Sequence, residues 1–174
     1  MTDELYLELT DNEWPLTYTD HDRPIVRAIL FDDEGLFHFV HAVRDDDFGG
    51  NTIIETSGGG VEPGEDLFEA IKRELREELG AKVEIIGKIG VVSDYYNLIH
   101  RHNINHYFLC KLISLGESDM TEDEKTIFHL EPLTISYEDA VKEYERCAQT
   151  RLGRLLYARE MPILKRAKEM IDTL

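Results

Sequence analysis

Basic residues and cysteines are scarce in this chain of 174 residues. Lys and Arg together number 19 against 36 Asp and Glu, which gives a formal net charge of −17. A nucleic-acid partner would be repelled on average, so any phosphate site must gather positive charge locally. The two cysteines, Cys110 and Cys147, lack metal-ligand spacing, and the apolar run around Cys110 predicts a buried structural thiol.

Long apolar runs are absent as well. The chain has no run of about 18 apolar residues, which is the length needed to span a membrane. Its first ten residues lack the basic and apolar regions of a signal peptide. We therefore expect no membrane partner, no nucleic-acid partner and a cytoplasmic location. With 42% hydrophobic and 32% charged residues, the chain is typical of one globular domain over residues 1–174.

Local patterns predict a mixed α/β domain. β-rich runs flank a hairpin turn at Asp32–Gly35, and helical periodicity follows the glycines at 58–60. We expect an N-terminal extension at 1–20, C-terminal helices within 136–172, and a helix break or kink at Pro162. The expected strands are 5–9, two runs within 24–44, 52–56, 82–93, 104–115 and the start of 128–135; the expected helices are 65–79, 137–148 and 154–171; the expected loops are 45–51 and 116–125.

The segment from Ser57 to Ala81 turns from a glycine-rich loop into an amphipathic helix. On a helical wheel, four apolar residues share one sector of roughly 80° and predict the core-facing stripe. Gly80 is well placed to end the helix in the left-handed conformation. The predicted stripe consists of Phe68, Ile71, Leu75 and Leu79.

Three carboxylates crowd the last turns of this helix, at Glu74, Glu77 and Glu78. The helix dipole disfavours an anion there by roughly 0.3–1 kcal/mol each, and like charges four residues apart repel one another. A solvated acidic face is the ordinary explanation of such a run. However, these acids border the apolar stripe, so a divalent cation held by hard oxygen ligands is the alternative that we favour.

The same segment resembles the signature of the Nudix hydrolase superfamily. The signature places a Gly, a Glu, an Arg-Glu pair, two further Glu residues, a Gly and a hydrophobic residue at fixed spacing. Every fixed position is matched, although Ala81 is only weakly hydrophobic. The matching residues are Gly59, Glu65, Arg73, Glu74, Leu75, Glu77, Glu78, Gly80 and Ala81.

This resemblance implies a Nudix-type α/β/α sandwich, with a mixed β-sheet between helices. It also implies hydrolysis of a diphosphate linkage in a nucleoside diphosphate derivative, with Mg²⁺ as cofactor and Mn²⁺ as an alternative. The metal ligands carried over by position are the Gly59 carbonyl, Glu74, Glu77 and Glu78. One carboxylate, most often the equivalent of Glu74, deprotonates the attacking water instead. Arg73 is expected to pair with Glu65 and to hold the loop against the helix.

Five residues outside the signature are further site predictions. Glu124 lies in an acidic segment where many relatives keep another acid that acts as base or metal ligand, and a solvated loop is the alternative. Glu55 matches an upstream acid of the ADP-ribose-cleaving branch. Arg27 and Arg44 could bind phosphate or lie on the surface, and Tyr96 could stack on a base or simply pack.

The substrate stays open between a nucleotide sugar or ADP-ribose-like compound and a nucleoside triphosphate. A Nudix-like module that senses a nucleotide without cleaving it is the competing function. The resemblance also leaves a homodimer open. The His100–His106 segment lacks the ordered spacing of a zinc site, so its histidines contact substrate or serve no site.

Overall fold

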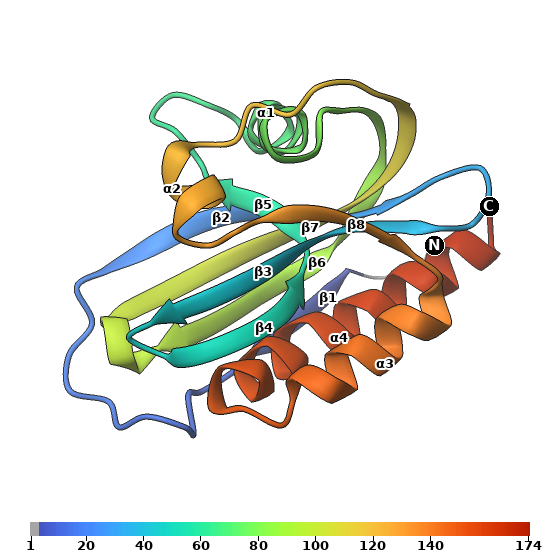
Figure 1. Ribbon diagram of the computed structural model, residues 1–174. Helices are drawn as coiled ribbons and strands as arrows, with labels where there is room; N and C mark the ends of the chain where they lie inside the picture. The colour runs from blue at the N-terminus through green and yellow to red at the C-terminus, as the bar shows by residue number, and fades with distance from the viewer. Residues whose placement is uncertain (1–3) are drawn as a thin grey trace.

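A mixed β-sheet is the centre of the computed structural model, which describes residues 4–174 apart from the side chain of His21. In the described part the sheet has eight strands, in the order β1-β6-β7-β2-β3-β4, with β5 paired to β2 and β8 paired to β3 (Figure 1). Strand β1 runs parallel to β6, and β2 runs parallel to β7. The strands are β1 Leu5–Glu8, β2 His21–Phe31, β3 Phe37–Asp46, β4 Gly49–Glu55, β5 Ser57–Gly60, β6 Ala81–Tyr96, β7 Arg101–Leu115 and β8 Glu131–Ile135.

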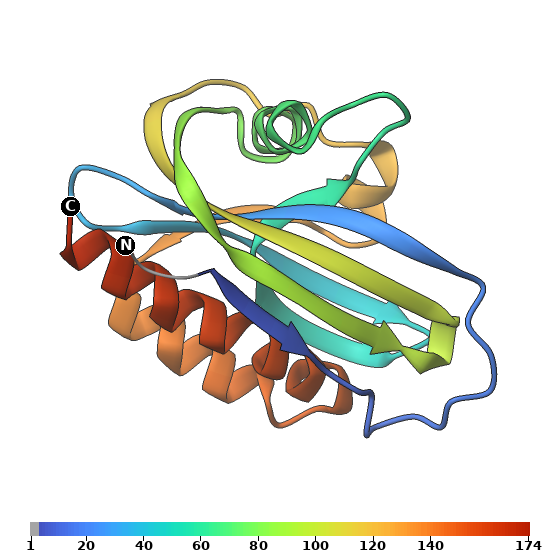
Figure 2. The ribbon, with the colours of Figure 1, turned by 180° about the vertical axis from the view of Figure 1, so that it is seen from behind.

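Helices cover both faces of this sheet. Helix α1 lies on one face, and α3 and α4 lie side by side on the other, as Figures 1 and 2 show. The fold prediction, a sandwich with a mixed sheet between helices, is therefore confirmed. No helix in residues 4–174 has the length and apolar character needed to cross a bilayer. The helices are α1 Leu67–Leu79, α2 Glu122–Thr126, α3 Tyr137–Cys147 and α4 Arg151–Asp172, with a 3-10 turn at Asn97–Ile99.

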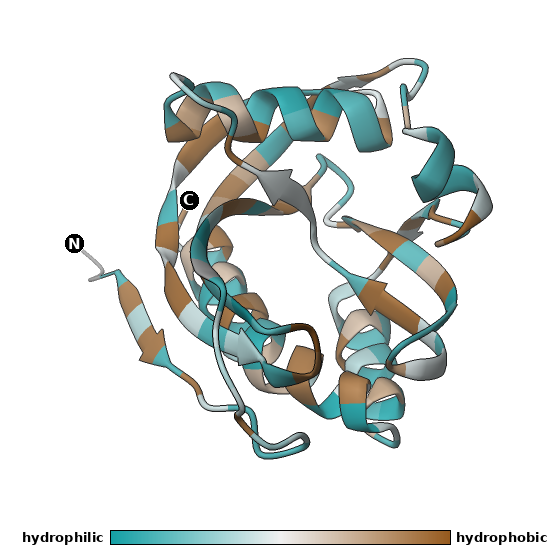
Figure 3. Cartoon of the chain, turned by 90° about the vertical axis from the view of Figure 1, so that its left-hand side faces the viewer, coloured by the Kyte–Doolittle hydropathy of each residue, from teal (hydrophilic) through white to brown (hydrophobic). Residues whose placement is uncertain are grey.

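The alternation of side chains along the strands builds two hydrophobic cores. On β2, Ile29 and Phe31 belong to the core under α3 and α4, whereas Val26 and Leu30 belong to the core under α1. Successive residues of a strand point to opposite faces, so one apolar strand can serve both layers. The same alternation is visible along β1 in Figure 3.

Several predicted boundaries are wrong, because pairing with distant strands outweighs local preference. The glycines at 58–60, expected to form a turn, form strand β5 beside β2. The predicted loop 45–51 is largely strand, with β3 and β4 paired as far as Asp46 and Gly49. Of the predicted N-terminal extension 1–20, residues 1–3 lie outside the described residues.

The predictions for 116–135 also need correction. The acidic loop contains helix α2, which Thr121 caps: its side chain accepts the backbone N–H of Glu124, whose own side chain accepts the N–H of Thr121. Strand β8 contains Pro132 instead of ending at it, and it pairs only with β3. An edge strand tolerates proline because one row of its backbone groups needs no partner.

Two helix predictions fail for reasons of packing. Phe68, placed in the core-facing stripe, is 57% exposed, and its ring only touches that of Phe108 at 5.5 Å between centroids. Ala70 is buried in the first turns of α1 instead. Helix α4 runs without interruption through Pro162, so of the predicted break or kink the break is wrong and the kink stays a prediction. The buried residues on both sides of the proline hold this helix on the sheet.

A buried ion pair anchors α4 to the strands. The Glu160 carboxylate accepts hydrogen bonds from the backbone N–H of Thr56 at 2.8 Å and from the Tyr144 hydroxyl at 3.3 Å, and it also contacts the Tyr107 hydroxyl. Arg159 lies 3.6 Å from it and donates to the Tyr96 hydroxyl at 2.6 Å. Burial raises the pKa of Glu160, but Arg159, Arg27 and these hydrogen bonds leave it below its ordinary value.

Glu160→Ala should lower the free energy of unfolding by about 3–5 kcal/mol, because it removes a buried charge partner of Arg159 and the acceptor of the Thr56 and Tyr144 hydrogen bonds. Asp172→Ala is the control, since Asp172 forms an exposed ion pair with Lys168 and its loss should cost less than about 1 kcal/mol. Urea denaturation measures both variants. Equal effects of the two substitutions would contradict this account of the core.

Candidate functional site

Helix α1, which follows β5, is capped at both ends. Asp66 caps the helix: its side chain accepts the N–H of Glu69, whose side chain accepts the N–H of Asp66. At the other end, Gly80 has a φ of 65° and donates to the carbonyls of Arg76 and Leu75. Because both ends are capped, the carboxylates of the last turns have a defined position relative to β5.

Arg73 joins the glycine loop to the carboxylates. Its Nε and Nη2 donate to the two Glu65 carboxylate oxygens at 2.7 and 2.8 Å, and Nη2 also donates to the Gly60 carbonyl at 3.0 Å. Its Nη1 donates to Glu74 at 2.8 Å and to Glu77 at 3.3 Å. Hydrogen bonding to Arg73 lowers the pKa of Glu65 to about 2. One guanidinium therefore holds three of the acids in place.

Glu74 lies directly against Gly59. A Cβ atom placed on Gly59 would be 2.6 Å from Oε1 of Glu74, so only glycine leaves room for the carboxylate here. Burial raises the pKa of Glu74; Arg73 opposes this rise, and repulsion from Glu77 and Glu124 adds to it. The backbone of β5 thus comes as close to the carboxylate as the resemblance implies.

Glu78 is the most buried acid of the cluster, at 5% exposure. It accepts hydrogen bonds from the Ser57 hydroxyl at 2.6 Å and from the Gly58 N–H at 3.0 Å. Burial raises the pKa of Glu78 to about 8; the two donors oppose this rise, and the neighbouring Glu124 carboxyl adds to it. The structure thus brings Glu124, from α2, to the cluster, and both acids line one hollow.

The donor types in the cluster fit a hard divalent cation. Glu77 and Glu124 raise the pKa of Glu74, and Glu124 raises that of Glu78, an arrangement that a cation would stabilise. Among residues 4–174, however, no three His, Cys, Asp or Glu side chains are arranged so that they could already hold a metal ion. Arg73 contacts one oxygen of Glu74 and one oxygen of Glu77, which leaves the second oxygen of each carboxylate free of Arg73.

Two adjoining hollows extend from this cluster. The first, of about 270 Å³, is lined by Glu78 and Glu124 and is called the carboxylate hollow. The second, of about 160 Å³, is lined by Tyr96, Asn103 and several apolar side chains and is called the inner hollow. The residues shared by both hollows are Arg23, Ile25, Arg27, Arg44, Glu55 and Arg101.

The four predicted substrate residues all line these hollows. Arg27 donates to the Asn105 side chain at 3.2 Å and to the Thr56 carbonyl at 3.3 Å. Arg44 pairs with Asp46, and its guanidinium lies 4.8 Å from the centroid of the Phe128 ring.

The other two predicted substrate residues, Glu55 and Tyr96, contact Arg159 of the buried ion pair. Glu55 is held 3.9 Å from buried Arg159. The Tyr96 ring is packed edge-on against Phe48, and its hydroxyl accepts a hydrogen bond from Arg159. Tyr96 is therefore part of the wall of the inner hollow and does not offer a free ring face on which a base could stack.

Arg23 and Arg101 line both hollows but were not among the predicted site residues. Burial lowers the pKa of Arg23, and repulsion from Arg101 and Arg27 lowers it further. A signal was present in the sequence: Arg23, Ile25 and Arg27 alternate on the same strand face as the core residue Ile29. Cations on the apolar side of a strand indicate a site where the core opens to solvent.

The histidines of the His100–His106 segment do not assemble into a site. His100 stacks on Tyr18, while His102 contacts Asp22 and Ser93. Cys110 is free and fully buried, as predicted, and burial raises the pKa of its thiol to about 12. Neither group lines the carboxylate hollow.

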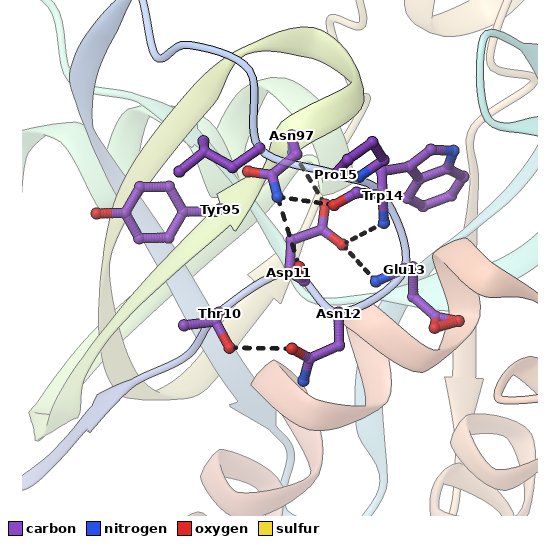
Figure 4. A pocket seen from close by; sticks show the side chains of 9 residues that line it. Thr10, Asp11, Asn12, Glu13, Trp14, Pro15, Tyr95 and Asn97 are labelled. Carbon is purple, nitrogen blue, oxygen red and sulfur yellow. Dashed lines mark hydrogen bonds between the residues drawn. The ribbon is translucent and has the colours of Figure 1, made fainter.

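A larger hollow of about 540 Å³ shares no residue with these two and is lined by residues 10–16, Tyr95 and Asn97 (Figure 4). Asp11 organises it by accepting the N–H groups of Glu13, Trp14 and Asn97 at 2.8–3.0 Å. These bonds fasten the N-terminal segment to the turn after β6. The site acids and arginines therefore do not line this hollow.

Comparison with known proteins yields one family. Residues 21–149 match the family model described as the NUDIX domain. Among solved structures, a NUDIX hydrolase from Nitrosomonas europaea superposes with a TM-score of 0.59 at 17% identity, covering 72% of this chain and 79% of that one. The MutT protein from Methanosarcina mazei Go1 gives a TM-score of 0.58 at 19% identity and covers 90% and 98%. At such identities the likeness concerns the fold alone.

Matches among curated proteins are short and strong. The nucleoside triphosphatase NudI of Enterobacter sp. (strain 638) is 66% identical over 29 residues, which are 17% of this chain and 21% of that protein. NudI of Escherichia fergusonii is 64% identical over 33 residues, or 19% and 23% of the two chains. The match thus spans about a fifth of the length of these relatives.

Glu65→Gln should lower the free energy of unfolding by about 1–3 kcal/mol at pH 7, because it removes one charge of the Arg73 pair. The pKa of Glu65 is depressed in the fold, so its stabilisation is complete above its ordinary value of 4.5 and is lost as pH falls through about 2. Urea denaturation of both proteins should show their difference shrinking over this window. A constant difference would contradict the role of this pair.

Proposed function

The chain belongs to the Nudix family, and from that membership we propose that it hydrolyses the diphosphate linkage of a nucleoside diphosphate derivative with a divalent cation. One observation carries this proposal: the acids of α1 and α2 meet four arginines in one hollow. In a chain with a net charge of −17, such a gathering of cations suits a phosphate substrate.

The groups that would hold Mg²⁺, or Mn²⁺ in its place, are the Gly59 carbonyl and the carboxylates of Glu74, Glu77 and Glu78. When bound, the cation neutralises phosphate oxygens and lowers the pKa of a bound water. Glu74 is packed on Gly59, and the glycine lets the backbone come close to the acids. Arg73 keeps this backbone and the helix together through Gly60 and Glu65.

The remaining residues bind, orient and accept protons. Arg27 and Arg44 face the hollow with positive charge and are held by their own hydrogen bonds, so they would orient a phosphate with little further ordering. Glu74 and Glu124 are the two groups that we propose as proton acceptors for the attacking water. Glu55, which lines both hollows, would contact the part of the substrate that enters the inner one.

A nucleoside triphosphate is the substrate that we favour over a nucleotide sugar or ADP-ribose-like compound. The short NudI matches support it, since those relatives are named nucleoside triphosphatases. We propose that residues 1–174 act as one domain, because β1 and α4 both pack on the central sheet.

A sensing module without turnover is the second candidate. Two observations in residues 4–174 favour it: Arg73 pairs with Glu74 and Glu77, and no three His, Cys, Asp or Glu side chains are arranged around a metal position. Tight nucleotide binding with no product under any divalent cation would establish it in place of hydrolysis.

Glu78→Gln should reduce kcat by about 100-fold or more, because an amide cannot lose a proton to become the anionic ligand that Glu78 would become when a cation binds. A nucleoside triphosphatase assay with phosphate detection measures it, and circular dichroism checks the fold. Retention of wild-type turnover by the folded Glu78→Gln protein would show that the roles are assigned wrongly.

The two acids of α2 provide a matched pair. Glu124 lines the carboxylate hollow, whereas Glu122, two residues away, is exposed and lines neither hollow. Glu124→Gln should lower kcat about 10-fold or more, and Glu122→Gln should leave it within about twofold. Equal rates for the two variants would remove Glu124 from the site.

Mg²⁺ and Mn²⁺ should bind the protein measurably when nucleotide is present. Isothermal titration calorimetry should show uptake in the wild type and its loss in a Glu77→Gln/Glu78→Gln double variant, because two hard anionic ligands are gone. Removal of divalent ions with EDTA should abolish turnover, and re-addition of these ions should restore it. Uptake unchanged in the double variant would place the cation elsewhere.

A further inference from the structure

Four arginines line the hollows, and strand pairing explains how two of them meet. Strands β2 and β7 are parallel neighbours, with Arg23 opposite Asn103 and His21 opposite Arg101. Because alternate residues of paired strands share a face, Arg23, Arg101 and Asn103 stand on the same side of the sheet. That side carries the inner hollow.

These two arginines differ from the other two in their bonding. Arg27 and Arg44 each have hydrogen-bond partners in the protein. For the Arg23 and Arg101 side chains, no hydrogen bond and no ion pair occurs within the described range 4–174. Arg23 is half-buried; burial and the like charges of Arg101 and Arg27 lower its pKa, and Glu74 only partly opposes them, so a further anion beside Arg23 would stabilise its charge.

Arg23 lies beside the carboxylate cluster. A Cβ atom on Gly60 would be 3.0 Å from Nη2 of Arg23, and one on Gly59 would be 2.6 Å from Oε1 of Glu74. Cβ positions of adjacent strand residues point to opposite faces, so these two contacts lie on opposite faces of β5. Arg23 does line the carboxylate hollow together with Glu78 and Glu124, so a group bound at Arg23 would share that hollow with one bound at these two acids.

A second unpartnered group faces the same space. The Asn103 side chain is 4% exposed and lines the inner hollow, and its Oδ1 has no hydrogen-bond partner in the described residues. Because this atom is an acceptor, its missing partner is a donor such as a hydroxyl group or a water molecule, and it does not itself support an anion.

From these observations we propose that Arg23 and Arg101 form a second anion site, which binds a phosphate beyond the linkage that is cleaved. The site makes the enzyme select nucleoside triphosphates over nucleoside diphosphates joined to a neutral sugar. A sugar in that position would leave both guanidinium groups unpaired, whereas a third phosphate pairs with them. This inference rests on the proposed function for its catalytic consequence.

Steady-state kinetics with a nucleoside triphosphate and a nucleoside diphosphate sugar, both with Mg²⁺, test the selectivity. The Arg23→Gln/Arg101→Gln variant should lower kcat/KM for the triphosphate about 100-fold, chiefly through KM, and lower that for the sugar derivative less than about threefold. Arg23→Lys should recover part of the loss, since it restores the charge without the planar fork.

Lys142→Gln is the control for net charge, because Lys142 is exposed on α3 and lines neither hollow. Lys142→Gln should leave kcat/KM for both substrates unchanged. Equal losses on the two substrates in the double arginine variant would assign these arginines to the cleaved linkage or to folding, and would overturn the proposal. No loss on either substrate would also overturn it.

A binding experiment separates this inference from the proposed function. Calorimetric titration with inorganic triphosphate in the presence of Mg²⁺ should show affinity that falls about 10- to 100-fold in Arg23→Gln and is unchanged in Lys142→Gln. If no substrate is hydrolysed but this difference appears, the proposed reaction fails and the anion site stands. Equal affinity in wild type and Arg23→Gln refutes the anion site whatever the turnover.

Discussion

The arrangement of the site depends on one guanidinium, that of Arg73. It bonds both oxygens of Glu65, the carbonyl of Gly60, and the carboxylates of Glu74 and Glu77. Without this cation, Glu74 and Glu77 would lose their ion-pair partner in the C-terminal half of α1, where the dipole already disfavours anions. The contact also ties a glycine strand to a helix, so backbone and carboxylates keep a common position.

Charge is distributed across the molecule in a way that serves this site. The chain is strongly acidic, yet four of its arginines surround two adjoining hollows. Arg27 and Arg44 are held by protein partners, whereas Arg23 and Arg101 have no hydrogen-bond or ion-pair partner among the described residues, and we propose that they bind an anion. The ion pair of Arg159 and Glu160 joins α4 to the strands. Because this pair also bonds Tyr96 and Thr56, which line the hollows, helix packing and the site depend on the same buried charges.

Prediction from sequence succeeded where the signal is local and failed where it is not. The helix of residues 67–79 follows from its apolar period, its cap and Gly80. Phe68 has the same period but is 57% exposed, with its ring against that of Phe108. Helix α2 carries a capping box that could have been recognised at Thr121 and Glu124, whereas β5 forms only because β2 offers it a partner.

By itself the sequence determined the family, the acids of one helix and the arginine that joins them, because these residues are neighbours along the chain or one helical turn apart. Only the tertiary structure decided which arginines meet the acids, since Arg23, Arg44 and Arg101 come from three strands whose pairing is not local. It also decided that Glu160 of the last helix supports Thr56 beside the site. Contacts between distant segments follow from the burial of whole sheet faces, which no short stretch of sequence encodes.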